Sequence, residues 1–158
     1  MPPDRKPPIP PFHVRQLSIE DGLALAASPQ PAAWQVYDAL EPFPPDEGYW
    51  AVADSQDALL GFCCLGEPAR APGETGHPAV LDIAIGIRSG LSGQGWGAEL
   101  GRAAVAYARS VAVDRRLRTT VPEWNKVGLR VAEQSGFTRS GTLSLGAHQY
   151  IVLEQPGR

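Results

Sequence analysis

The residues of this chain with the clearest chemical meaning are four glycines set between an apolar alternating segment and a long helical pattern. They occupy positions 90, 93, 95 and 97, after Leu81–Ile87 and before the helical spacing that runs to about Val113. Residues without side chains let backbone N–H groups approach an anion, and the helix dipole favours negative charge at a helix start. The sequence therefore predicts a phosphate-bearing ligand at Gly93–Ala98.

Three interpretations of Gly93–Ala98 compete. A dinucleotide fingerprint G-x-G-x-x-A fits the segment, with Asp114 about twenty residues later. However, Asp114 precedes the next predicted strand, whereas the ribose-binding acid of that fold belongs at the strand's C-terminal end. The absence of a G-K-[ST] sequence excludes a Walker-type loop. The other two interpretations are a purely structural strand–helix turn and a pyrophosphate cradle of another kind.

The elements that must position this segment form a mixed α/β pattern. A proline-dominated flexible tail is expected at 1–11, followed by a single domain at 12–158. Alternation and turn signals predict strands at 12–17, 49–54, 59–65, 80–87, 117–121, 137–145 and 149–153. Helical spacing predicts helices at 19–27, at 32–40, from the glycines to about 113, and at 126–134.

Composition excludes several classes of function. A net charge of −3 gives no broad attraction to nucleic acid, and no apolar run reaches the roughly 18 residues of a membrane span. The N-terminus lacks the apolar core of a signal peptide, so a cytoplasmic location is expected. Cys63 and Cys64 are adjacent in an apolar strand and are expected to be buried free thiols. The three histidines have no metal-ligand spacing, so no metal site is predicted.

Two motifs at the right separation resemble the GNAT N-acetyltransferases. The family hallmark [RQ]-x-x-G-x-[GA] corresponds to Ser92–Gly97, with Ser92 in place of the leading Arg or Gln. A second block, an Asn after the fifth strand and a helix ending in G-F, corresponds to Asn125–Phe137. Its V-A-E-x-x-G-F ending resembles the branch that acetylates protein N-termini and related amines. The resemblance covers Phe12–Leu153 and implies a mostly antiparallel sheet with a splayed central parallel pair, flanked by helices.

The resemblance implies acetyl transfer from acetyl-CoA to a primary amine by direct attack in a ternary complex. The amine would belong to a small molecule or a peptide, bound between 32–48 and 143–150, where several acids favour a cationic acceptor. A homodimer is among the states left open. Asn125 would lie near the CoA arm, or would simply cap a helix. The other residues that the resemblance places on acetyl-CoA are Ile85, Gly86 and Ile87 along the pantetheine arm, and Ser92, Gly93, Gln94, Gly95, Trp96 and Gly97 around the phosphates.

The next question is which side chains would accept the proton of the amine and protonate the leaving thiolate. Asp82 is the predicted general base, because it alternates with the isoleucines and so faces one side of the binding strand, with Glu123 as the alternative. Many relatives place a Tyr seven residues after the Asn as the acid for the leaving thiolate, and here that position is Ala132. Tyr150, Tyr37 or water would take its place. A catalytically degenerate acyl-CoA-binding protein and, more remotely, a dinucleotide-binding oxidoreductase are the alternative functions.

Overall fold

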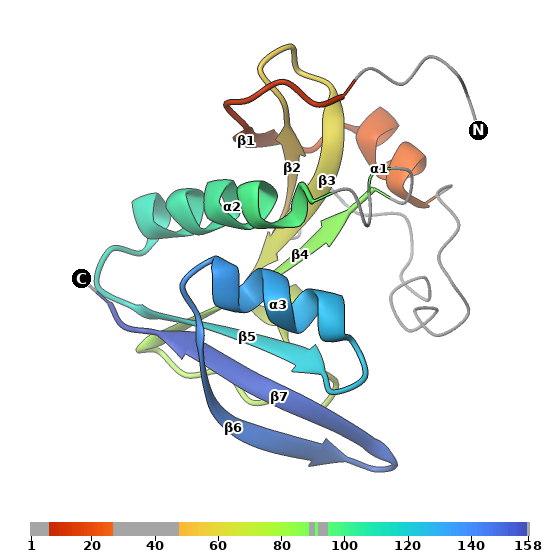
Figure 1. Cartoon of the computed structure of the whole chain (residues 1–158). Coiled ribbons are helices and arrows are strands. Elements are labelled where there is room, and N and C mark those ends of the chain that lie inside the picture. The colour runs from red at the N-terminus through yellow and green to blue at the C-terminus, as the bar shows by residue number, and fades with distance from the viewer. Residues whose placement is uncertain (1–6, 27–47, 89–90, 92–94, 158) are drawn as a thin grey trace.

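The structure, a computed structural model, describes residues 7–26, 48–88, 91 and 95–157. The helix predicted at 32–40 and the loop residues Ser92, Gly93 and Gln94 lie outside these ranges. The elements in chain order are β1 (His13–Gln16), α1 (Ile19–Ala26), β2 (Tyr49–Ala53), β3 (Leu59–Leu65), the 3₁₀ helix η2 (Glu67–Ala69), β4 (Val80–Ile87), α2 (Gly97–Val111), β5 (Arg116–Pro122), α3 (Lys126–Gln134), β6 (Thr138–Leu145) and β7 (His148–Gln155) (Figure 1).

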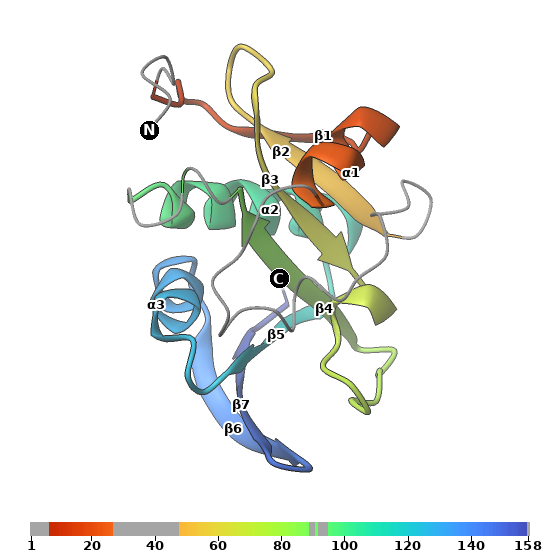
Figure 2. The same ribbon diagram turned by 90° about the vertical axis from the view of Figure 1, so that its right-hand side faces the viewer.

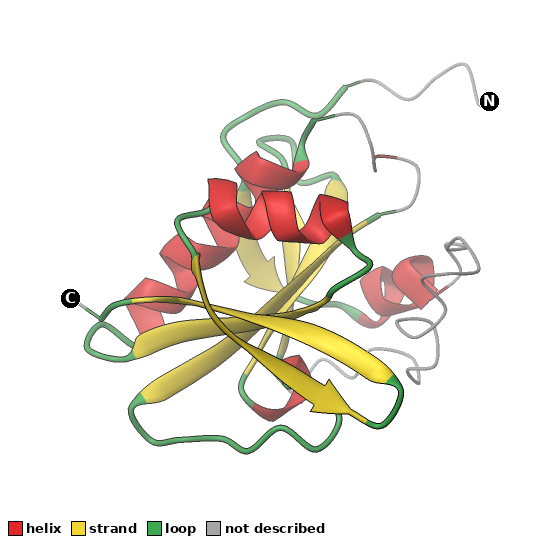
Figure 3. Ribbon diagram, turned by 60° about the horizontal axis from the view of Figure 1, so that its bottom comes forward, coloured by secondary structure: helices red, strands yellow, loops and turns green. Residues whose placement is uncertain are grey.

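One seven-stranded sheet, in the order β1-β2-β3-β4-β5-β7-β6, organises the described residues. Every neighbouring pair is antiparallel except β4 and β5, which run parallel at the centre. The predicted mixed sheet with a central parallel pair is thereby confirmed. Figures 2 and 3 show α2 and α3 on one face of the twisted sheet and α1 with η2 on the other.

The alternation in β4 arises because its two faces meet different layers. Leu81 and Ile83 pack with Leu100, Ala104 and other small residues of α2 in the main core. A second cluster, built from residues such as Leu17, Leu25 and Cys64, fills the face under α1. Small side chains on α2 let this helix approach the sheet closely, which explains the alanine-rich sequence.

The two cysteines confirm the strand alternation directly. Cys63 belongs to the main core and Cys64 to the cluster under α1, so the neighbouring side chains point to opposite faces. Both thiols are free, and burial raises the pKa of each to about 12. They are therefore packing residues with no thiolate character near neutral pH.

Differences from the predicted elements are local. The helix α2 ends at Val111, two residues early, because Ala112 leaves the helical region with φ −140° and ψ 70°. The short η2 lies between the predicted strands at 59–65 and 80–87, where no helix was predicted. In the predicted tail, the Ile9 N–H donates to Asp54 Oδ2 at 3.1 Å and the Ser55 N–H donates to the Ile9 carbonyl at 2.8 Å. Ile9 is therefore bonded to the turn between β2 and β3.

None of the helices in the described ranges combines the length and the apolar character needed to cross a bilayer. No group of three or more His, Cys, Asp or Glu side chains in these ranges is arranged to hold a metal ion.

Candidate active site

The two central strands are joined only where they begin. β4 pairs with β5 at Val80–Arg116, Leu81–Leu117 and Asp82–Arg118, and the ladder stops there although both strands continue. The strands diverge beyond that point (Figure 1). We call the opening between Ile83–Ile87 and Thr119–Pro122 the fork. One edge of β4 there has no strand partner among the described residues.

Hydrogen bonds to β3 show which backbone groups of β4 are already used. The Gly66 N–H donates to the Asp82 carbonyl at 2.8 Å, and the Arg88 N–H donates to the Leu60 carbonyl, also at 2.8 Å. These two bonds belong to one antiparallel register between β3 and β4. In such a ladder the backbone groups of successive residues point alternately towards and away from the partner. The even-numbered residues of β4 therefore bond to β3.

The backbone N–H and C=O groups of the odd-numbered residues of β4 consequently point into the fork. Ile85 and Ile87 direct their backbone N–H and C=O groups into it, as a strand-mimicking ligand requires. Gly86, which was predicted beside them, turns its backbone to β3 instead, opposite Phe62. A Cβ on Gly86 would lie 2.3 Å from Phe62 Cε1, so this glycine makes room for an aromatic ring.

Gly95, Trp96 and Gly97 are the described part of the predicted phosphate loop. Gly95 has φ +86°, in the left-handed region that favours glycine, and no described residue other than its chain neighbours lies within 4 Å of the position its Cβ would take. Trp96 packs against Phe12 with ring centroids 5.8 Å apart. The positive φ of Gly95 turns the chain sharply just before α2.

The first turn of α2 combines close packing with uncapped amides. A Cβ on Gly97 would lie 2.7 Å from Val131 Cγ2, so glycine lets α3 pack here. Trp96 is the N-cap residue and makes no side-chain capping hydrogen bond. Helix-start N–H groups without a capping side chain are suited to an anion.

Asn125 is the N-cap of α3. Its side chain is buried, and its Oδ1 accepts from the Gly128 N–H at 2.9 Å. The capping role is therefore confirmed. The predicted contact with the CoA arm stays a prediction. Ala132, where many relatives carry Tyr, is a buried core residue on the same helix.

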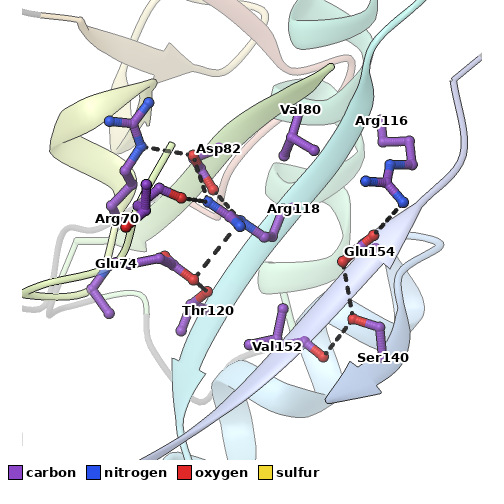
Figure 4. Close-up of polar contacts among 12 residues, drawn as sticks. Arg70, Glu74, Val80, Asp82, Arg116, Arg118, Thr120, Ser140, Val152 and Glu154 are labelled. Atoms are coloured by element: carbon purple, nitrogen blue, oxygen red, sulfur yellow. Dashed lines mark hydrogen bonds and ion pairs between the residues drawn. The ribbon is translucent and has the colours of Figure 1, made fainter. Parts of the chain in front are cut away.

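Asp82 lies at the closed end of the fork, and both of its carboxylate oxygens are engaged. Its side chain is only 2% exposed; Oδ1 accepts from Arg118 Nε at 2.6 Å and Oδ2 from Arg70 Nε at 2.9 Å (Figure 4). The hydrogen bond that Arg118 donates to the Asp82 carboxylate raises the pKa of the Arg118 guanidinium. A carboxylate held between two guanidinium groups favours a structural role over the predicted role of general base.

The same arginine ties the segment between β3 and β4 to β5. Arg118 Nη2 donates to the Thr75 carbonyl at 2.9 Å, and Thr120 Oγ1 donates to Glu74 Oε2 at 2.7 Å (Figure 4). Sequence reasoning missed Arg70, Glu74 and Arg118. Their meeting follows from the parallel register of β4 and β5, for which the sequence offers no local signal.

Glu123 and Tyr150 lie on the β5 side of the fork. Glu123 is exposed, and its backbone N–H donates to the Gln149 carbonyl at 2.9 Å. Tyr150 is 7% exposed and lies opposite Pro122 in the ladder between β5 and β7. In the described ranges no hydrogen bond joins Asp82, Glu123 and Tyr150, and their catalytic roles stay predictions.

Several solved acetyltransferase structures share this fold. A GNAT-family acetyltransferase from Bacillus anthracis has a TM-score of 0.70 and 14% identity, over 92% of this chain and 94% of that one. Aminoglycoside acetyltransferase AAC(6')-Ib in complex with coenzyme A has a TM-score of 0.69 and 19% identity, over 92% and 95%. A chimera of spermidine N-acetyltransferase SpeG from Vibrio cholerae with hSSAT has 0.68 and 15%, over 92% and 95%. At such identities the likeness establishes the fold.

Sequence comparison supplies the family. No curated protein matches the chain in sequence. The family model of the acetyltransferase (GNAT) domain matches residues 17–138, which is most of the chain and includes β4, the glycine segment and α3. The protein therefore belongs to the GNAT family of acetyltransferases, whose cosubstrate is acetyl-CoA.

Proposed function

We propose that this protein transfers the acetyl group of acetyl-CoA to a primary amine, by direct attack of the amine while both substrates are bound. The fork carries the proposal. Because the ladder between β4 and β5 stops at Asp82–Arg118, Ile85 and Ile87 offer backbone hydrogen-bonding groups to a ligand lying between the strands.

The described residues fit acetyl-CoA in two places. The pantetheine arm carries amide groups, which match the backbone N–H and C=O groups of Ile85 and Ile87. The phosphates match the uncapped start of α2, which follows the sharp turn at Gly95. When bound, acetyl-CoA supplies an activated acetyl thioester.

The chemistry requires a donor for the charge that develops on the thioester oxygen. We assign this role to the backbone N–H of Ile85, which points into the fork and is held rigidly by the strand. The amine must attack in its neutral form, so a group must accept its proton. Asp82 is already saturated by Arg70 and Arg118, which leaves the exposed Glu123, acting through water, as the candidate base. Tyr150, buried on the β5 arm, is the candidate donor for the departing thiolate.

The acceptor is proposed to be a cationic amine. Two of the proteins with this fold are named for aminoglycosides and spermidine, which are both multiply amine-bearing small molecules. The acids of the predicted acceptor region at 32–48 point to the same chemistry, although most of that region lies outside the described residues. A peptide N-terminus is the acceptor that the sequence resemblance adds.

Thiol release from acetyl-CoA tests the proposal. A polyamine, an aminoglycoside and a short peptide with a free N-terminus should be compared, and the acetylated product identified by mass spectrometry. We expect at least one amine to accelerate thiol release above the rate of acetyl-CoA hydrolysis. Binding of CoA without turnover of any amine would instead favour the catalytically degenerate acyl-CoA-binding protein. Tight NADH binding without CoA binding would favour the oxidoreductase.

A further inference from the structure

Arg88, directly after β4, is partly buried, and its guanidinium has no partner among the residues that the structure describes. Its backbone is fixed, because the N–H donates to the Leu60 carbonyl and the carbonyl accepts from the Leu91 N–H, both at 2.8 Å. Its Nε is buried and makes no hydrogen bond, and in the described ranges the guanidinium forms no ion pair. Removing a charged group from water is costly unless an opposite charge or a hydrogen bond compensates it.

The other arginines show that this situation is unusual in the molecule. Each remaining partly buried arginine in the described ranges has at least one hydrogen bond to a carboxylate or a carbonyl. Arg115 is the closest parallel, since its Nε is also buried without a partner, but its Nη2 donates to the Val80 carbonyl. The arginines with partners are Arg15, Arg70, Arg109, Arg115 and Arg118.

Packing places the turn at Arg88 beside the start of α2. Ile87 and Leu91, on either side of it, contact the core cluster that contains Leu100 of the first turn of α2. Gly61, which pairs with Ile87, confirms the proximity, because a Cβ there would lie 3.0 Å from Leu100 Cδ1. The backbone of Arg88 and the uncapped amides of α2 therefore lie at the same end of the fork.

We propose that Arg88 binds a phosphate group of coenzyme A. The inference rests on the proposed function and adds a residue that the family pattern does not predict. That pattern begins its phosphate motif with Arg or Gln, and this chain has Ser92 there. Arg88 restores the positive charge from the end of β4. A guanidinium suits this role, because its planar set of N–H donors matches two phosphate oxygens and its charge does not depend on pH.

Isothermal titration of CoA and dephospho-CoA into the wild-type protein and Arg88→Gln tests the proposal. Loss of a charge-assisted contact should weaken CoA binding by about tenfold or more. An equal loss for both ligands identifies a pyrophosphate contact. A loss confined to CoA identifies the 3′-phosphate, which dephospho-CoA lacks. Unchanged affinity for both ligands overturns the proposal.

Two further variants keep the test specific. Arg115→Gln is the matched control, because it removes a second arginine with an unpartnered Nε from a site bonded to Val80, and its CoA affinity should equal that of the wild type. Arg88→Met keeps the apolar stem without the charge and replaces Arg88→Gln if that variant fails to fold. If the wild-type protein does not bind CoA, the proposed function falls together with this inference. If the wild type binds CoA and both Arg88 variants bind it equally well, only the inference falls.

Discussion

Asp82 lies in β4 and Arg88 directly after it, six residues later, yet the two charges differ in how far they are compensated. Asp82 is fully buried and receives hydrogen bonds from two arginines at the closed end of the fork. Arg88 lies at the open end, with a buried Nε and with no partner for its guanidinium among the described residues. A saturated buried charge holds chain segments together, whereas an unsaturated one leaves a contact for a ligand. β4 thus separates a structural end from a ligand-binding end.

The largest expected effect is on stability, from Asp82→Ala. Removing one partner of a buried ion pair leaves the other charge uncompensated, which costs about 3–5 kcal/mol. Urea denaturation should show this loss in the free energy of unfolding. The double variant Asp82→Leu with Arg118→Met should recover part of it, because it removes one of the two guanidinium charges left behind and leaves that of Arg70. A cost below about 1 kcal/mol for Asp82→Ala would show that the pair is not structural.

The next largest expected effect is on the stability of a variant at Gly86, which lies between Asp82 and Arg88 in the sequence. Gly86→Ala places a methyl group 2.3 Å from Phe62 Cε1, and overpacking of this kind costs about 1–3 kcal/mol. Combining it with Phe62→Leu should restore part of the free energy of unfolding. If the double variant is no more stable than Gly86→Ala, the ring contact is not the reason for the glycine.

A smaller loss of stability is expected at Asn125, outside β4, whose Oδ1 accepts a hydrogen bond from the Gly128 N–H. Asn125→Ala removes the cap of α3 and should cost about 1 kcal/mol in thermal or urea unfolding. Asn125→Asp retains an acceptor for the Gly128 N–H and serves as the control. If CoA affinity falls in Asn125→Ala while stability does not, Asn125 contributes to ligand binding, as Arg88 is proposed to do, and not to stability.

The smallest expected effect is a loss of folding stability at low pH. Burial alone would raise the pKa values of Asp21 and Asp54, but hydrogen bonds from Arg15 and Ser18 to Asp21, and from backbone N–H groups to Asp54, lower both overall. A carboxyl whose folded pKa is lowered contributes stability above its unfolded pKa of about 3.9, and that contribution is lost as the pH falls through the folded pKa. Unfolding measured between pH 7 and pH 2 should therefore show a loss below about pH 4. The loss should be smaller in Asp54→Asn, and an identical profile in that variant would contradict this assignment.

Sequence alone predicted the elements whose patterns are local. The alternation over Val80–Ile87 and the helical spacing over Lys126–Gln134 gave both elements with their observed bounds. Asn125 was recognisable because a capping residue acts within its own turn. The parallel central pair followed from the family resemblance and not from any local pattern.

The roles of charges could not be predicted, because they depend on register. Nothing in the residues around Asp82 indicates that Arg118, 36 positions later, lies opposite it. The role of general base was assigned from the alternation of β4, which fixes the face of a side chain but not its partners. Arg88 carried no sequence signal either, since burial without a partner is a property of the packed molecule.

Thermal unfolding with and without CoA compares the two ends of β4 most directly. At a CoA concentration of about 100 times the wild-type Kd, binding should stabilise the protein by about 2.7 kcal/mol. Arg88→Gln should keep the ligand-free Tm and lose about 1.4 kcal/mol of that stabilisation, or about 3–6 °C of Tm shift. Asp82→Ala should lower the ligand-free Tm by about 6–20 °C and keep the shift. A full CoA shift in Arg88→Gln, with the shift lost in Asp82→Ala, would contradict the account.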